Sequence, residues 1–402
     1  MTTSASHGED GERLISGYEG NLFISISLAL FCIQIGRRLL PPFLPTIMTD
    51  LQITPASAGI AITTMAFMYA IFQYPGGRLA DGLTRKTVLV LGTGLVVCGF
   101  LLVSIAVVLP LLLFGAAVIG AGGGLYYISM RATTADLYTR RRAQSFGIQG
   151  AIGRVGSASA AGVAVVVLAV TSWRVAFVPL AIALAIAGVV IHRKSNEGYE
   201  FGRVDVGLAG TAQRLFKSLV IRRVLVAYVL VMFVLQGVLG FIPTYLQFER
   251  AFSPFLANAG YAAIYVIGVA VAPLSGYLAD RYQKLPIAGA GMVLAIVGLI
   301  GLVSVASPIL VGVSVLLFGF GMFAFPPATQ AFLVDVFDDE NFAGDLGASK
   351  TVYGGLGSFG PAYVGVVAGV WNYTIAYVGL ILVLAMAILV FAVALLDEPA
   401  QS

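Results

Sequence analysis

The chain alternates between long apolar runs and short polar or charged turns along almost its whole length. Each run is about 20 residues long, which is the length at which an α-helix crosses the hydrocarbon core of a bilayer. The runs lack the strict two-residue alternation of a transmembrane β-strand, so the pattern predicts spanning helices rather than a barrel. We expect twelve helices, at residues 21–47, 57–80, 87–108, 110–134, 143–169, 173–192, 222–247, 256–280, 286–305, 308–333, 344–369 and 371–396.

The composition agrees with this pattern, because 59% of the 402 residues are hydrophobic and only 10% are charged. A soluble domain carries about 25% charged residues, so the chain is expected in a lipid bilayer and not on nucleic acid. The two histidines, His7 and His192, leave little material for a metal site or a Ser-His-Asp site. Cys32 and Cys98 both lie in apolar runs and are interpreted as packing residues. We therefore expect a protein that is not an enzyme and has no cofactor.

One long polar stretch, from Arg193 to Arg223, interrupts the chain and separates six predicted helices from six. The organisation that follows comprises a tail at 1–20, an N-terminal six-helix bundle at 21–192, a central loop at 193–221, a C-terminal six-helix bundle at 222–396 and a tail at 397–402.

The two halves repeat short sequence landmarks in the same order. Gln34 and Pro41 of the first predicted helix match Gln236 and Pro243 of the seventh, and "LLFG" recurs at 112–115 and 316–319. Duplication of this kind is typical of transporters whose binding site lies at the interface between the repeats.

Basic residues are concentrated on one side of the predicted membrane. Fifteen lysines and arginines fall in the tails, loops and central segment of the side that holds both termini, whereas the opposite loops hold only Arg174 and Arg250. Since lysine and arginine accumulate in cytoplasmic loops, we expect both termini inside a multi-pass protein of the cell membrane. The N-terminal tail lacks a basic leader region, so no cleavable signal peptide is expected.

A short charged phrase occurs twice, after the second and the eighth predicted helix. It reads "GRLADGLTRK" at 77–86 and "GYLADRYQK" at 276–284. With this phrase and its twelve helices the chain resembles the major facilitator superfamily over essentially its whole length. The resemblance implies that family's fold, an all-α membrane protein with twelve transmembrane helices in two pseudo-symmetric six-helix bundles. The first copy departs from the family phrase at Gly82, where a basic residue is common, and at Thr84, where a glycine is common.

The resemblance also implies that the phrase acts as a gate on the cytoplasmic side. Asp81 is expected to meet the start of the eleventh helix in the outward-open state and to leave it as the inside opens. A carboxylate at a helix N-terminus contributes about 0.3–1 kcal/mol when exposed and up to ~2 kcal/mol when partly buried. The alternative is that these charges only mark a turn and help to set topology. The predicted gate residues are Gly77, Asp81, Arg85, Lys86, Arg131, Asp136, Gly276, Asp280, Arg281 and Lys284, with Arg85 and Arg131 as candidate partners of Asp136.

Charged residues in the middle of the predicted helices are all basic, because the nineteen acidic residues fall in loops, tails or helix ends. An arginine at the bilayer centre costs roughly 2.5–3.5 kcal/mol on insertion scales, so such a side chain faces a cavity or a partner. Since no helix supplies an anionic partner, the substrate is the simplest source of the missing negative charge.

Arg154 is the best-placed of these cations, about ten residues or ~15 Å from the inner end of the fifth helix. A structural bond to a backbone carbonyl is the alternative. Lys350, on the symmetry-related eleventh helix, is expected near Arg154 or else directed toward Asp345. The adjacent Arg37 and Arg38 point about 100° apart, so one should line the cavity while the other caps carbonyls freed by prolines. The predicted substrate-binding residues are Arg154, Arg37, Arg38, Lys350, Gln34, Tyr126, Tyr127, Gln236 and Gln330.

Two functions remain open at this level. The favoured one is a secondary active transporter that works by rocker-switch alternating access and binds a small anion through membrane-embedded arginine. The alternative is a proton-driven multidrug efflux pump for lipophilic compounds, which usually needs a titratable carboxylate in the membrane. In both cases the partners are a small-molecule substrate and the lipid bilayer, and a monomer is expected.

Overall fold

The computed structural model describes residues 14–200, 202, 219–336 and 342–396, and the regular secondary structure in these ranges is helical. The first half contains α1 (Gly17–Arg38), α2 (Leu40–Asp50), α3 (Pro55–Ile71), α4 (Gln73–Gly82), α5 (Arg85–Ser104), α6 (Leu109–Leu137), α7 (Arg142–Val170), the short 3-10 helix η1 (Trp173–Ala176) and α8 (Phe177–Lys194). The second half contains α10 (Leu219–Phe248), α11 (Pro254–Arg281), α12 (Lys284–Ser304), α13 (Pro308–Val336), α14 (Phe342–Gly357), α15 (Gly360–Val370) and α16 (Tyr373–Leu396).

The twelve predicted helices are confirmed, and three of them are interrupted. Within the described ranges, eleven continuous or nearly continuous helices are long and apolar enough to cross a membrane. The one remaining predicted helix, the eleventh in chain order, is the pair α14 and α15, which is broken at Ser358 and Phe359. The first helix is likewise broken at Leu39, between α1 and α2, and the second at Phe72, between α3 and α4.

Proline accounts for two of these breaks. Pro41 and Pro42 occupy the first positions of α2, and Pro361 occupies the first turn of α15. A proline has no N–H to donate to the preceding turn, and its ring clashes with the carbonyl four residues back. The helix therefore ends before the proline, and the next helix starts one residue ahead of it, which bends the path of the chain inside the membrane.

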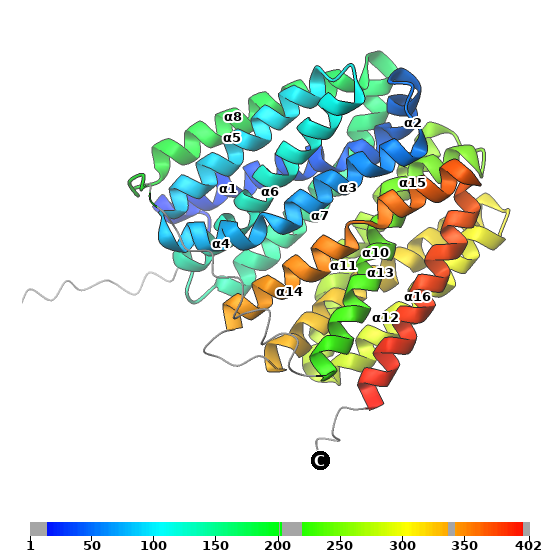
Figure 1. The fold of residues 1–402 in the computed structure, drawn as a ribbon. Coiled ribbons are helices and arrows are strands. Elements are labelled where there is room, and N and C mark those ends of the chain that lie inside the picture. The colour runs from blue at the N-terminus through cyan, green and yellow to red at the C-terminus, as the bar shows by residue number, and fades with distance from the viewer. Residues whose placement is uncertain (1–13, 201, 203–218, 337–341, 397–402) are drawn as a thin grey trace, which may run out of the picture.

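The helices form two bundles, which Figure 1 shows as a blue-to-green half and a green-to-red half. The α1 helix begins and α16 ends on the same side of the molecule, which we call the terminal side. The opposite side, which holds the α2–α3 and α15–α16 turns, is called the far side.

The two bundles are closely packed on the far side. The backbone at Gly59 of α3 lies directly against Pro361 of α15, and Gly365 of α15 lies against Pro55 of α3. In addition, the backbone N–H of Ala362 donates to the Thr63 hydroxyl at 3.0 Å. At both glycines a methyl group would collide with the backbone of the other bundle, so the absence of a side chain permits this approach.

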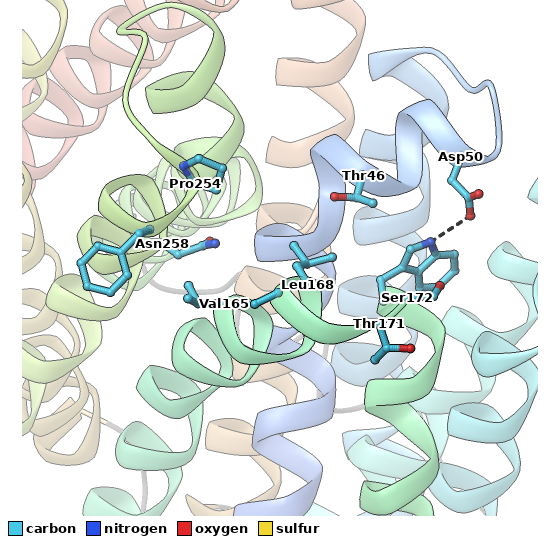
Figure 2. Close-up of a pocket in the computed structure, with 11 residues that line it drawn as sticks. Thr46, Asp50, Val165, Leu168, Thr171, Ser172, Pro254 and Asn258 are labelled. Carbon is cyan, nitrogen blue, oxygen red and sulfur yellow. Dashed lines mark hydrogen bonds between the residues drawn. The ribbon is translucent and has the colours of Figure 1, made fainter.

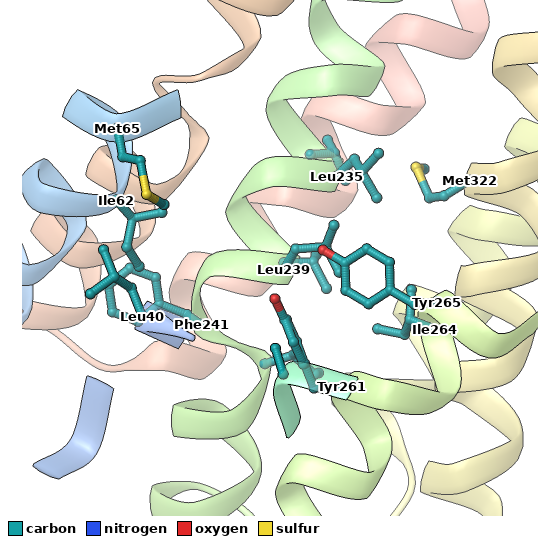
Figure 3. Close-up of a cluster of buried hydrophobic side chains, with 14 of the residues drawn as sticks. Leu40, Ile62, Met65, Leu235, Leu239, Phe241, Tyr261, Ile264, Tyr265 and Met322 are labelled. Carbon is teal, nitrogen blue, oxygen red and sulfur yellow. The ribbon is translucent and has the colours of Figure 1, made fainter. Parts of the chain in front are cut away.

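Apolar side chains continue this contact toward the centre of the molecule. Leu40 and Ile62 of the first bundle and Leu239 and Tyr261 of the second belong to one cluster of buried residues that lies between the bundles (Figure 3). The Tyr261 hydroxyl donates across the interface to the backbone carbonyl of Arg38 at 3.2 Å. Packing and hydrogen bonds thus hold the bundles together along the α3–α15 contact and the adjoining cluster.

Candidate functional site

A cavity of about 210 Å³ lies between the bundles near the middle of several helices. Most of its wall comes from α1, α6 and α7 of the first bundle, and α11 and α13 of the second bundle add two aromatic rings. The lining residues are Leu30, Gln34, Arg38, Tyr127, Met130, Arg131, Gln149, Gly150, Gly153, Arg154, Ser157, Tyr265 and Phe323.

Three arginines, Arg38, Arg131 and Arg154, line this cavity, and no acidic residue of the described part of the chain lines it. Arg154 has no hydrogen-bonding or ion-pair partner within the described part of the chain. An unpaired guanidinium in this position leaves positive charge available to a bound molecule. The structure therefore brings the best-placed predicted residue, Arg154, together with Arg38, Tyr127 and Gln34.

The other two arginines rest on aromatic rings. The Arg38 guanidinium lies 5.5 Å from the centre of the Tyr265 ring, and that of Arg131 lies 3.9 Å from the centre of the Phe146 ring. The ring face attracts a cation without neutralising its charge. Both guanidinium groups are thus held in place while their charge stays available to the cavity.

Glycines of α7 make room for these side chains. Gly150 and Gly153 face the cavity on the same helix as Arg154, and a Cβ at Gly150 would lie 3.4 Å from the Arg154 Nη1 atom. Gly153 packs beside the Gln34 and Leu30 side chains of α1. Small residues at these positions let α1 and α7 approach closely while the long arginine side chain occupies the free volume.

Arg37 has a different environment from Arg38. Its side chain is 4% exposed, its Nη1 donates to the Gln34 Oε1 at 3.0 Å, and its guanidinium lies 3.4 Å from the centre of the Tyr69 ring. The expectation that only one of the two arginines lines the cavity agrees with this geometry. The Arg37 guanidinium does not cap the carbonyls freed by the prolines, however, because it contacts the Gln34 amide and the Tyr69 ring instead.

Other predicted binding residues lie outside the cavity lining. Tyr126 is fully buried and its hydroxyl donates to the backbone carbonyl of Ile26, so it contributes to helix packing. Gln330 donates to the Tyr228 hydroxyl at 3.1 Å within the second bundle, and Gln236 is half-buried on α10. Lys350 is half-buried and lies within electrostatic range of Tyr127 and Arg131.

Sequence reasoning missed several lining residues, among them Gln149, whose side-chain amide can both donate and accept hydrogen bonds. Gln149 is 1% exposed, and its Nε2 donates to the Thr134 hydroxyl at 2.7 Å, while its Oε1 has no donor. Gln149, Gly153 and Ser157 follow one another at intervals of four residues, so they share the helix face that borders Arg154. That spacing could have identified them.

The predicted gate contains one of the expected ion pairs. The Arg85 Nε lies 3.2 Å from the Asp136 Oδ2. Both residues belong to the first bundle, so this pair connects α5 to α6 rather than one bundle to the other. In this conformation Asp136 is therefore paired with Arg85, the first of its two candidate partners, while Arg131 turns into the central cavity.

Lys86 binds the start of the central loop. Its Nζ donates to the backbone carbonyls of Ser195 and Glu197, each at 3.0 Å, and its backbone N–H donates to the Glu197 carboxylate at 2.9 Å. The Thr84 hydroxyl donates to the Gly198 carbonyl at 2.8 Å. Residues 195–200, which we call the loop anchor, are thus fixed to the start of α5.

The second copy of the charged phrase is less constrained. Asp280 is exposed and accepts no hydrogen bond within the described residues. The Arg281 Nη1 donates to the Tyr277 hydroxyl at 3.0 Å. The Asp81 and Asp345 side chains lie outside the described part, as do the expected contacts of Asp81.

Comparison with known proteins connects these features to a family. The family model described as Major Facilitator Superfamily matches residues 26–361 and 272–402. A curated relative, the probable sulfoacetate transporter SauU of Cupriavidus necator, is 28% identical over 281 residues, which cover 64% of this chain and 64% of that protein. The match thus extends over less than two thirds of the relative's length.

Solved structures share the fold at low sequence identity. Two crystal structures of a bacterial homolog of the human lysosomal transporter Spinster, one inward-facing and occupied and one inward-facing and unoccupied, superpose with a TM-score of 0.83. Each is 15% identical to this chain and covers 96% of it and 100% of its own chain.

Proposed function

This chain belongs to the major facilitator superfamily and is a secondary transporter, and we propose that it carries a small organic or inorganic anion. The observation that supports this cargo is the central cavity, whose wall, as far as the chain is described, contains three arginines and no acidic residue. A carboxylate, sulfonate or phosphate group would accept charge-assisted hydrogen bonds from Arg154 and offset the cost of its burial.

The relative from Cupriavidus necator supports the same chemistry. Its name gives sulfoacetate as the substrate, a molecule with a carboxylate at one end and a sulfonate at the other. A cavity that presents the guanidinium groups of Arg38, Arg131 and Arg154 offers more than one cation to such a dianion. We infer that the cargo class of this chain is a compact anion with one or two acidic groups.

The transport cycle that we propose is rocker-switch alternating access. The bundles meet on the far side through Gly59, Gly365 and their proline partners, and the similar solved structures are inward-facing. The excess of basic residues on the terminal side supports a cytoplasmic location for both termini in the cell membrane. Together these features favour an inward-facing state with the far side closed toward the exterior.

Uptake by the purified protein in proteoliposomes tests the cargo. We expect saturable uptake of radiolabelled sulfoacetate, loss of that uptake in Arg154→Ala, and partial uptake in Arg154→Lys, which keeps the charge but not the two-pronged geometry. Arg222→Ala is the matched control, because Arg222 is exposed on α10 away from the cavity. Full uptake by a folded Arg154→Ala protein would remove this residue from the binding site.

A thermal-shift screen separates the anion carrier from the multidrug pump. Small mono- and dianions are expected to raise the melting temperature of the purified protein, and Arg154→Ala should abolish the shift. A shift with lipophilic cations alone would support the drug-efflux alternative instead.

A further inference from the structure

A second and larger cavity, of about 620 Å³, lies on the far side (Figure 2). The end of α2, the end of α7 and the turn after it form one wall, and the first turns of α11 form the other. The lining residues are Thr46, Asp50, Val165, Leu168, Ala169, Thr171, Ser172, Trp173, Pro254, Phe255 and Asn258. The central anion cavity shares none of them.

Asn258 is the unusual residue of this cavity. Its side chain is 1% exposed, and neither the Oδ1 nor the Nδ2 atom has a hydrogen-bonding partner among the residues that the structure describes. Figure 2 shows its amide directed from α11 toward the space beside Thr46 and Leu168. A buried amide that loses its water partners without gaining others is unfavourable. A bound molecule with both an acceptor and a donor would satisfy it.

The cavity offers no net charge to its occupant. Among the described residues, Asp50 is the one charged residue that lines it. The Asp50 Oδ2 accepts a hydrogen bond from the Trp173 indole Nε1 at 3.0 Å and is also paired with the Arg174 guanidinium. Because this carboxylate is already neutralised, the cavity favours an uncharged ligand, in contrast to the cationic central cavity.

The remaining wall is divided between apolar and hydroxyl side chains. Val165, Leu168 and Phe255 supply apolar surface, and Thr46 and Ser172 supply hydroxyl groups. We propose that this cavity is a second binding site, distinct from the transport site, for an uncharged amphiphile whose hydroxyl or carbonyl head binds Asn258 and whose hydrocarbon body covers the apolar wall.

The position of the site couples it to the transport cycle. Its two walls belong to different bundles, and they separate when the far side opens. A ligand that contacts both walls binds the closed far side better than the open one, and therefore shifts the population toward the closed state. The amphiphile thus inhibits transport without entering the central cavity.

Fluorescence of Trp173 reports occupancy directly. The chain has two tryptophans, so Trp371→Phe leaves Trp173, which is 1% exposed and lines the site. In lipid nanodiscs, 8-bromooctan-1-ol should quench this fluorescence in a saturable manner, because bromine quenches indole on contact. 8-Bromooctanoate, which has the same chain length and carries a negative charge, should bind far more weakly.

Asn258→Leu tests the polar contact. It should weaken the quenching by 8-bromooctan-1-ol about tenfold, which corresponds to one hydrogen bond of a neutral group, while removal of the unpaired amide keeps the fold intact. Asn258→Ser, which retains a hydroxyl, should weaken it less. In proteoliposomes the alcohol should inhibit anion uptake by wild type and much less by Asn258→Leu.

Three results would overturn the proposal: absence of saturable quenching, equal quenching by the octanoate, or unchanged quenching in a monodisperse Asn258→Leu protein. The first would mean that only water occupies the cavity, and the second would indicate an anion site. Because quenching is measured without transport, these outcomes are independent of whether the central cavity carries an anion.

Discussion

The two glycines at the far-side interface provide the sharpest test of alternating access in this protein. A Cβ at Gly59 would lie 3.1 Å from the Pro361 carbonyl carbon and 3.2 Å from the Ala362 Cα, with the Pro361 oxygen closer still. A Cβ at Gly365 would lie 3.0 Å from the carbonyl carbon of Pro55. Carbon atoms pack best at about 3.5–4.0 Å, so either alanine requires the bundles to separate by roughly 0.5–1 Å on this side.

The expected cost follows from that overlap. Overpacking of a close contact by one methyl group costs about 1–3 kcal/mol. The clash exists only while the far side is closed, so Gly59→Ala and Gly365→Ala each shift the equilibrium toward the open far side by about 5–150-fold. Uptake should slow, since the closed state becomes scarce.

A pair of spin labels measures this shift. Thr49→Cys at the end of α2 and Trp371→Cys after α15 place exposed labels on different bundles, in a background where Cys32 and Cys98 are serine. The label-to-label distance should increase in both alanine variants. Gly369→Ala is the control, because Gly369 lies one turn after Gly365 with no atom within 4 Å of a Cβ. Identical distances in all three variants would refute the reasoning.

Three further predictions concern residues of the first bundle. Arg37→Ala should lower the melting temperature while Arg154→Ala does not, because a buried hydrogen bond to a charged group contributes about 1.5–3 kcal/mol and only Arg37 makes one. Asp136→Asn should change the free energy of unfolding by less than about 1 kcal/mol, since its ion pair with Arg85 is partly exposed. Chemical denaturation at high salt should show no difference in this free energy between the variant and wild type. Lys86→Met should detach the loop anchor, and limited trypsin digestion should then cut after Lys194 faster than in wild type. An unchanged digestion rate would mean that the remaining hydrogen bonds, from the Thr84 hydroxyl and from the backbone N–H of residue 86, are sufficient to hold the anchor.

The helices and their number were predictable from the sequence, because a 20-residue apolar run has few alternatives in a bilayer. The interruptions at Leu39 and before Gly360 were only partly predictable. The prolines marked them, but a proline in a membrane helix can bend it or break it, depending on which neighbouring groups satisfy the freed carbonyls.

The binding residues show where sequence reasoning fails. Tyr126 and Tyr127 are equally good candidates in the sequence, yet their side chains point about 100° apart, and only Tyr127 reaches the cavity. The rotation of α6 against its neighbours decides between them, and a single sequence carries no record of it. The same rotation directs Arg131 into the cavity, so Asp136 forms its ion pair with Arg85.

The loop anchor determines where foreign sequence fits into this protein. Residues 195–200 are hydrogen-bonded to the start of α5, so the start of the linker belongs structurally to the first bundle. A reporter domain inserted before Ser195 would separate this segment from the start of α5, whereas one inserted after Glu200 would leave its hydrogen bonds to α5 intact.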